Sequence, residues 1–449
     1  MPDDSGERTK RRDRAVLQGA FATGVVRVVR AGTSFVTLGI AARVLTTDEF
    51  GLVAMLISLW LILTNFDMGL GGALTTRVAV SHARDGLADV RVHVDHALFA
   101  LSAIGGFIAV TGTISALTMP WHEWLGGDLP SSTVVRSVIV AFVVSGATLP
   151  AAVGYLTLSG MQRFTLVQTC IAAAGLAGMV ASAAVAPFQP PPDLFVLTML
   201  GGPLLVTLGF TAWIRFGVLH GVMAPARFEV GRFKDMLRAS GWYALYNAAN
   251  TVSLGTGTVI VGSVLGLAEA AVFAVASRLF SPITSVVLAS GTQLWPGMTE
   301  AISRGDVAWV RSRYRHGLVS VTGASVALSV VLVAIGPWVA ELWVGPDLVP
   351  PLSLLVWTAA FTISVAITLQ AAVVLMAVER IRVAAALAVC AAVLGVGASV
   401  LLTQAVGVNG AAIGALTACL AVLLPAVSLL ARSTLRALDP AGGSVHSAR

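Results

Sequence analysis

Charged side chains are scarce in this sequence. Only 11% of the 449 residues are Asp, Glu, Lys or Arg, whereas 57% are hydrophobic, and the mean hydropathy is +0.88. A soluble domain carries about 25% charged residues on average, so the composition excludes an ordinary soluble protein. The apolar residues form runs of about 20 or more, the length with which a helix crosses about 30 Å of hydrocarbon. We therefore predict an all-α integral membrane protein.

Lysine and cysteine are rarer still, and their scarcity excludes several kinds of site. The two lysines, Lys10 and Lys234, lack the glycine-rich context of a phosphate-binding loop. All three cysteines fall inside apolar runs, which is typical of packing residues and not of disulfide or metal partners. The seven histidines lack metal-site spacing. We expect no metal, no cofactor and no catalytic residue.

Lys and Arg are absent from alternate connections between the apolar runs. Apolar length and turn signals predict about twelve spans, at residues 17–43, 50–72, 94–118, 132–158, 164–187, 193–217, 240–265, 268–296, 316–338, 350–378, 383–405 and 408–431. The connections without Lys or Arg include PWHEWLGGDLP and PWVAELWVGPDLVP, whereas the N-terminal tail and the other connections are rich in arginine. By the positive-inside rule, both termini lie in the cytosol and the chain is a multi-pass protein of the cell (inner or plasma) membrane.

The placement of the cations also predicts the partners. The formal net charge is +6, but the cations flank hydrophobic spans and form no single basic face, which argues against nucleic acid. Arg77, Arg84 and Arg91 lie in one basic connection, where we expect contacts with the anionic headgroups of membrane lipids. The connections without cations are short and leave no room for a catalytic domain on the outer side.

An internal repeat appears when the chain is compared with itself at an offset of 220 residues. Glu49 then meets Glu269, His96 meets His316 and Cys170 meets Cys390, with further arginine and glycine matches. Each repeat holds six spans, so the halves are parallel repeats, a recurrent plan for transporters with the substrate path between the halves. The predicted segments are a tail (1–16), an N-lobe (17–219), a cytosolic amphipathic linker (220–239), a C-lobe (240–431) and a C-terminal tail (432–449).

Two arginines lie inside the first predicted span. A charge at the bilayer centre costs about 2.5–3.5 kcal/mol on insertion scales, so such residues are candidates for function. Arg27 and Arg30 share one helix face. At the 220-residue offset they meet Asn247 and Asn250, which form a polar stripe with Tyr243 in the seventh span. We predict a central cleft lined by these two spans, cationic on one side and neutral on the other, although Arg27 can also reach the cytosolic headgroups.

Two further intramembrane charges accompany this cleft. Asp67 lies in the second predicted span, where it serves either ion coupling or an arginine as a structural partner. Arg278 lies in the eighth span, four residues before Pro282. Because proline cannot donate to the Arg278 carbonyl, we expect a kink and a hinge at Pro282, beside a buried cation.

The segments LGIAARVLTTDEFGLVAMLISLW and LTNFDMGLGGALTTR resemble the N-terminal region of polysaccharide-biosynthesis export proteins, the O-antigen-type flippases of the multidrug/oligosaccharidyl-lipid/polysaccharide superfamily. The segment LGLAEAAVFAVASRLFSPITSVVLASGTQLWPGMTEAISRGD looks like the matching part of the second half. The resemblance covers residues 17–430 and rests on loose glycine and hydrophobic patterns. It implies two six-helix lobes, alternating access and a polyprenyl-pyrophosphate-linked oligosaccharide as cargo, with other polysaccharide assembly proteins as partners.

Related lipid II flippases hold the pyrophosphate with arginines in the central cavity, and the resemblance implies this role for Arg27, Arg30 and Arg278, which match by location. The chain lacks the two additional C-terminal helices typical of those flippases, which argues against lipid II as cargo. One alternative is a cation-coupled drug or metabolite exporter of the same superfamily, in which Asp67 is the coupling carboxylate. A second alternative is a membrane glycosyltransferase or polysaccharide polymerase, for which the outer connections supply few acidic residues.

Overall fold

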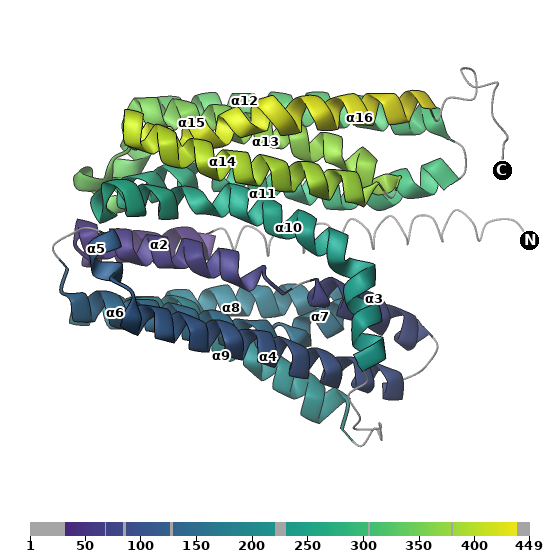
Figure 1. Ribbon diagram of the computed structural model, residues 1–449, viewed down its shortest axis with the longest axis horizontal. Helices are drawn as coiled ribbons and strands as arrows, with labels where there is room; N and C mark the ends of the chain where they lie inside the picture. Colours follow the sequence, from purple (N-terminus) through teal and green to yellow (C-terminus); the bar gives the residue numbers. More distant parts are fainter. Residues whose placement is uncertain are drawn as a thin grey trace, which may run out of the picture. The chain divides into compact units, whose positions relative to one another are not determined.

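The chain is helical in the part that the structure describes (Figure 1). The structure is a computed structural model, and it describes residues 32–67, 69–83, 87–125, 129–220, 230–303, 306–378 and 380–437. Within these ranges, eleven helices are long and apolar enough to cross a membrane, and the shorter apolar helix Gly32–Val44 precedes them. Each of the twelve falls on a predicted span, which confirms the predicted class of a multi-pass helical membrane protein.

Several spans consist of two or more elements in direct succession. For example, Ser131–Gly160 and Asn409–Ala437 are each one candidate span although their helices change type or break. The elements that follow Gly32–Val44 are α2 (Thr47–Thr64), α3 (Leu70–Ala83), α4 (Leu87–Thr118), α5 (Trp121–Leu125), α6 (Ser131–Ala151), α7 (Val153–Gly160), α8 (Phe164–Val185), η1 (Ala186–Phe188), α9 (Pro192–Trp213), η2 (Ile214–Val218), α10 (Val230–Leu265), α11 (Leu267–Ser303), α12 (Val307–Val344), η3 (Pro346–Leu348), α13 (Leu352–Ala377), α14 (Ile381–Val406), α15 (Asn409–Ala418), η4 (Cys419–Leu423) and α16 (Leu424–Ala437).

The helices group into two compact units. Unit 1 comprises Met1–Val44, Asp67–Met119 and Val135–Ser240, and unit 2 comprises Leu45–Phe66, Pro120–Val134 and Gly241–Arg449. Unit 1 thus contains α3, α4, α7, α8 and α9 with most of α6, whereas unit 2 contains α2 and α5 together with α11 to α16. The lobes predicted from the sequence, residues 17–219 and 240–431, stay a prediction.

Small residues let the helices of unit 1 approach each other closely. Gly105 of α4 faces Gly146 of α6, and a Cβ atom on either glycine would collide with the carbonyl oxygen of the other. In lipid, where apolar surface gains little from leaving the solvent, such backbone proximity is a main source of helix association. The crossing of α4 and α6 therefore depends on glycine at both positions.

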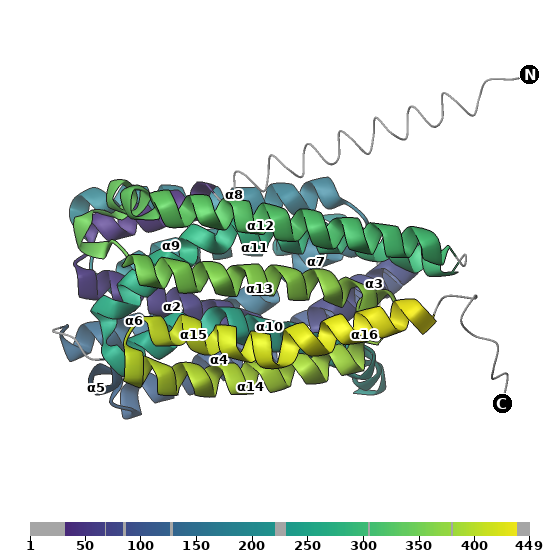
Figure 2. The same cartoon turned by 90° about the horizontal axis from the view of Figure 1, so that it is seen from above.

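One hydrophobic cluster in unit 2 contains residues of α10, α11, α12, α13, α14 and α16. It includes Tyr246 of α10, Val310 of α12, Val374 of α13, Ala385 of α14 and Ala431 of α16, all of them buried. The helices α12 to α16 run along one another in both views (Figures 1 and 2). On another side of this unit, α2 packs against α11.

Helix starts follow the 220-residue offset seen in the sequence. The helices α2 and α11 begin at Thr47 and Leu267, and α4 and α12 begin at Leu87 and Val307. Both pairs are 220 residues apart. The repeat in the amino-acid sequence is therefore also a repeat of secondary structure, although some helices differ in where they end.

The second predicted span, 50–72, was too long. Its helix α2 ends at Thr64, and a new helix, α3, begins at Leu70. Gly69 has a φ of 77°, a left-handed conformation that glycine adopts without steric cost. The Asp67 side chain meanwhile accepts hydrogen bonds from two backbone N–H groups of the next turn. The Asp-x-Gly sequence thus ends one helix and begins the next within the predicted span.

A second break separates α6 from α7, and Thr211 of α9 bridges it. Pro150, which has no N–H, lies two residues before the break. The Thr211 hydroxyl donates to the Ala151 carbonyl oxygen, 2.7 Å away, and accepts from the Gly154 N–H, 2.9 Å away. Because water is absent from the hydrocarbon core, freed backbone groups need such partners. One buried hydroxyl therefore satisfies two groups at the break.

Candidate functional site

One side of α10 carries the neutral polar residues of the predicted stripe. Tyr243, Asn247 and Asn250 are spaced four and three residues apart and share a helix face. Tyr243 and Asn247 are exposed and Asn250 is half-buried. Tyr246 and Ala249, next to this face on the same helix, lie in the core of unit 2. The Tyr243 and Asn247 side chains interact, and Asn250 Nδ2 donates to the Tyr246 carbonyl oxygen at 2.8 Å. The exposed surface of this spanning helix therefore includes a polar stripe beside apolar residues such as Trp242 and Leu245.

Arg278 lies in α11, a helix that includes the candidate span Leu267–Leu288. Its side chain is half-buried. Within the described ranges, no carboxylate lies near enough to form an ion pair with it. An arginine keeps its proton in proteins, so this span carries a fixed positive charge that no described acidic residue compensates.

Pro282 removes one backbone hydrogen bond beside this cation, and the hydroxyl of Ser281 supplies a substitute donor. The carbonyl of Arg278 would normally accept from the N–H four residues later, which proline lacks. Ser281 Oγ donates to the Arg278 carbonyl oxygen at 2.9 Å, and Ser285 Oγ donates to the Ser281 carbonyl oxygen at 2.9 Å. α11 continues through Pro282 to Ser303. The role of Pro282 as a hinge stays a prediction.

Asp67 occupies a different place from the one predicted. It lies in the turn between α2 and α3 and not within a helix. Its Oδ1 accepts from the Gly69 N–H at 2.9 Å, and its Oδ2 accepts from the Gly71 N–H at 3.0 Å. A carboxylate in this position satisfies unpaired N–H groups at a helix start and interacts favourably with its dipole. Asp67 therefore has a structural role as a cap, and its predicted role in ion coupling stays untested.

Arg27 and Arg30 lie outside the described residues, so the cationic side of the predicted cleft has no structural description. The described part of that span is the helix Gly32–Val44. Within it, Thr37 is buried and its Oγ1 donates to the Thr33 carbonyl oxygen at 2.7 Å. The predicted proximity of Arg27 and Arg30 to the α10 stripe stays a prediction.

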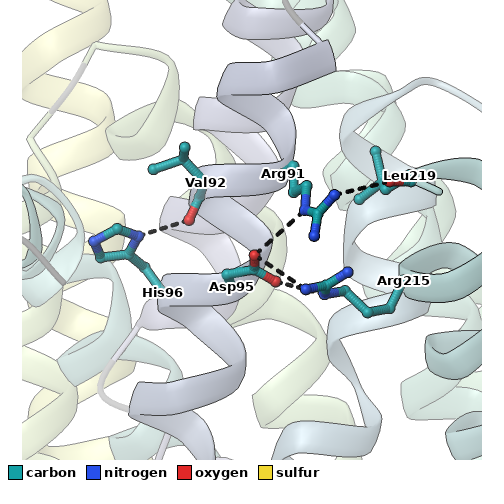
Figure 3. A network of polar contacts seen from close by, with 6 residues as sticks. All are labelled: Arg91, Val92, Asp95, His96, Arg215 and Leu219. Carbon is teal, nitrogen blue, oxygen red and sulfur yellow. Dashed lines mark hydrogen bonds and ion pairs between the residues drawn. The ribbon is translucent and has the colours of Figure 1, made fainter. Parts of the chain in front are cut away.

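A network of charged residues in unit 1 was not predicted from the sequence (Figure 3). Arg215 of η2 bonds to Asp95 of α4, with Nε 2.7 Å from Oδ1, and Arg91 Nε lies 3.7 Å from Oδ2 of the same carboxylate. Arg91 Nη1 also donates to the Leu219 carbonyl oxygen at 3.5 Å. The sequence predicts a lipid contact for Arg91, but its guanidinium ties α4 to the end of η2. The one sequence signal for this pair is that Asp95 and Arg215 have opposite charges and lie near the ends of predicted spans.

These residues offer hydrogen-bonding and charged groups that can bind a ligand. In the described ranges, no three His, Cys, Asp or Glu side chains gather as metal ligands would. Arg278 offers a planar set of donors that matches a phosphate or carboxylate. The amides and hydroxyl of the α10 stripe can both donate and accept, as sugar hydroxyls do.

A protein-family model described as "Polysaccharide biosynthesis protein" matches residues 16–302, which is more than half of the chain. A sequence search of the curated proteins gave no match.

Solved structures show the fold. A multidrug resistance MATE family transporter of the MOP superfamily, in an inward-facing conformation, superposes with a TM-score of 0.77 at 15% identity, covering 92% of this chain and 98% of that one. An outward-facing conformation of such a transporter gives 0.64 at 15% identity, covering 94% and 96%. A MOP superfamily transporter from Pyrococcus furiosus, described as having a binding pocket of reverse polarity, gives 0.63 at 16%, also covering 94% and 96%. The chain therefore has the MATE-like fold.

Proposed function

Because the chain belongs to the polysaccharide biosynthesis protein family and has the fold of MOP-superfamily transporters, we propose that it exports a lipid-linked oligosaccharide. The cargo is an oligosaccharide on a polyprenyl pyrophosphate, and it moves from the inner to the outer leaflet by alternating access for the synthesis of cell-surface polysaccharide. The lipid tail stays in the bilayer while the protein carries the polar head across. No covalent bond is made or broken, so the protein is a transporter and not an enzyme.

The observation that carries this proposal is Arg278. It is a half-buried cation in a spanning helix, and no described carboxylate pairs with it. Insertion scales put the cost of such a charge at about 2.5–3.5 kcal/mol near the bilayer centre, which favours a functional reason for its presence. A pyrophosphate supplies the missing negative charge and accepts paired hydrogen bonds from a guanidinium. Arg27 and Arg30 belong to the same proposal as further cations for the pyrophosphate.

The α10 stripe supports the sugar part of the cargo. Tyr243 and Asn247 are exposed on a spanning helix, where an outward polar face needs a polar partner or water. We assign Tyr243, Asn247 and Asn250 to contacts with sugar hydroxyls because each can donate and accept hydrogen bonds.

The membrane potential favours the proposed direction. With both termini in the cytosol and the cell interior negative, each negative charge that moves outward gains about 2.3 kcal/mol per 100 mV. A transporter of this design needs no nucleotide. The cation-coupled exporter gains no support, because both oxygens of Asp67 accept backbone hydrogen bonds.

The test replaces Arg278 in cells that lack the native gene. Arg278→Ala is expected to reduce restored surface polysaccharide by at least about tenfold, the loss expected for one charge-assisted hydrogen bond. Arg278→Lys keeps the charge and is expected to retain part of the export. Arg163→Ala, which removes an exposed arginine at the start of α8, is the matched control. Membrane abundance is measured for all three, and full export by Arg278→Ala at normal abundance would contradict the proposal.

A further inference from the structure

Besides Arg311, which has a partner within the protein, six exposed arginines lie at one end of unit 2, where α12 and α14 begin and α16 ends. We call this region the arginine end. The members are Arg313, Arg315, Arg380, Arg382, Arg432 and Arg436.

Contacts between the three helices show that these residues are neighbours. Arg380 Nη1 at the start of α14 donates to Thr434 Oγ1 of α16 at 3.4 Å. Tyr314 of α12 interacts electrostatically with Arg432 of α16. Tyr314 and Leu435 are also buried in the same core cluster as the start of α14. In Figure 2, α13 runs between α12 and α16, and α13 packs against both. The start of α12, the start of α14 and the end of α16 therefore lie at one end of unit 2.

The arginine end is not neutralised by acidic side chains that the structure describes. None of its six members forms an ion pair with a described residue. Arg313 lies over the Trp309 ring at 5.5 Å, and Arg380 contacts a hydroxyl. The nearby carboxylate of Asp306 accepts from the Trp309 N–H at 3.1 Å, as the cap of α12.

Some cations of unit 1 are paired with a carboxylate. There, Arg91 and Arg215 share the carboxylate of Asp95 (Figure 3). The pairing of unit 1 shows that this chain can compensate arginines at span ends internally. The arginine end lacks such partners among the described residues. Its cations are exposed, so they are available to an anion outside the protein.

We propose that the arginine end is a binding surface for the headgroups of anionic phospholipids. The ends of membrane-spanning helices lie at headgroup depth, where lipid phosphates are the abundant anions. Guanidinium groups bind phosphate oxygens in pairs and are weakly hydrated, which suits contact at the edge of a bilayer. Trp309, beside Arg313, is of the residue type that favours this depth. Lipid phosphate, held at the surface by its acyl chains, is the occupant, and free phosphate is not.

The test compares lipid binding by purified full-length variants. Native mass spectrometry measures how much phosphatidylglycerol and phosphatidylcholine remain bound after detergent extraction. The variant Arg380→Gln, Arg382→Gln, Arg432→Gln and Arg436→Gln is expected to retain phosphatidylglycerol at least about tenfold more weakly than the natural protein, and phosphatidylcholine equally. The same four positions changed to Lys keep the charge and are expected to retain most of the binding.

The control removes three arginines elsewhere, Arg43, Arg136 and Arg163, each changed to Gln, and is compared with the triple variant Arg380→Gln, Arg382→Gln and Arg432→Gln. The two triple variants lower the net charge equally, so equal loss of phosphatidylglycerol in both would show a general charge effect and overturn the proposal. Unchanged binding in the quadruple Gln variant would also overturn it. Inorganic phosphate is added as a competitor, and displacement of the lipid at equal concentrations would indicate a free-phosphate site instead. Size-exclusion profiles and circular dichroism confirm that each variant is folded.

Discussion

The second span of the first repeat and its counterpart in the second repeat begin at corresponding positions, 220 residues apart, but end differently. In the first repeat, α2 stops at Thr64 and α3 begins at Leu70; in the second, α11 runs unbroken from Leu267 to Ser303. At the 220-residue offset, Asp67 corresponds to Val287 and Gly69 to Ala289. Valine has no oxygen to accept from a helix start, and alanine disfavours a positive φ. The break between α2 and α3 therefore occurs where the sequence supplies the capping carboxylate of Asp67 and the glycine at position 69.

Proline alone does not break these helices. α11 contains Pro282 and continues, because Ser281 donates to the carbonyl that the proline leaves without a donor. The fourth spans of the two repeats give a second comparison. α6 and α7 are separated just after Pro150, whereas α13 is continuous and has Gln370 at the corresponding position. Thr211, which bridges the break, corresponds to Ala431. The break between α6 and α7 thus coincides with both a proline and a polar partner for the backbone groups at the break.

The largest expected effect is at Thr211. Thr211→Val keeps the shape of the side chain but leaves the Ala151 carbonyl and the Gly154 N–H without their partner. Each unsatisfied buried group costs about 1–3 kcal/mol, so the loss of both partners is expected to lower the free energy of unfolding by about 2–6 kcal/mol. Reversible unfolding in mixed detergent micelles measures the change.

Thr207→Val is the control for this prediction. Thr207 lies one turn earlier in α9, and its hydroxyl bonds only to carbonyls of its own helix. We expect a loss below about 1 kcal/mol. Equal losses at positions 207 and 211 would show that the bridge across the break has no special importance.

An intermediate effect is expected at Asp67. Asp67→Ala removes the cap of α3 and is expected to lower the free energy of unfolding by about 1 kcal/mol. Asp67→Asn keeps one of the two acceptor oxygens but turns an amide NH2 toward the other backbone N–H, so about half of this loss, about 0.5 kcal/mol, is expected. Export by Asp67→Asn is expected to remain near normal. Loss of export in this variant at normal stability would instead make Asp67 a coupling carboxylate.

The smallest effect is expected at Ser281. Ser281→Ala removes the donor to the Arg278 carbonyl and is expected to cost about 0.5–1.5 kcal/mol of unfolding free energy. Ser285→Ala is the matched control, because the Ser281 carbonyl oxygen, which accepts from Ser285 Oγ, also has the ordinary helical donor, Ser285 N–H, available to it. If Ser281→Ala and Ser285→Ala lower the free energy of unfolding equally little, the continuation of α11 through Pro282 does not depend on the Ser281 hydroxyl.

Much of the fold could be predicted because the bilayer imposes simple rules. Span length, arginine placement and the 220-residue repeat indicated twelve helices, and each predicted span corresponds to a helix in the described ranges. The break at Asp67 was missed because apolar length outweighed the Asp-x-Gly signal. The Asp-x-Gly sequence is absent from the second repeat. Interpreting it as a helix cap could have placed the end of α2 correctly.

The candidate site could be predicted only in part. Helical spacing placed Tyr243, Asn247 and Asn250 on one face of α10, and the structure shows that this face points away from the core of its unit. The pair Asp95–Arg215 and the bridge made by Thr211 join residues far apart in the sequence. Such contacts depend on which helices are neighbours, and single-helix periodicity carries no information about that.

The most direct test of the proposed export is the content of lipid-linked oligosaccharides in cells that lack this gene. Lipid extracts and surface glycans from deleted, complemented and parental cells are compared by mass spectrometry. We expect polyprenyl-pyrophosphate-linked oligosaccharides to accumulate and the surface polysaccharide to disappear, with both effects reversed by the natural gene. Unchanged surface glycans without any accumulated lipid-linked intermediate would contradict the proposal.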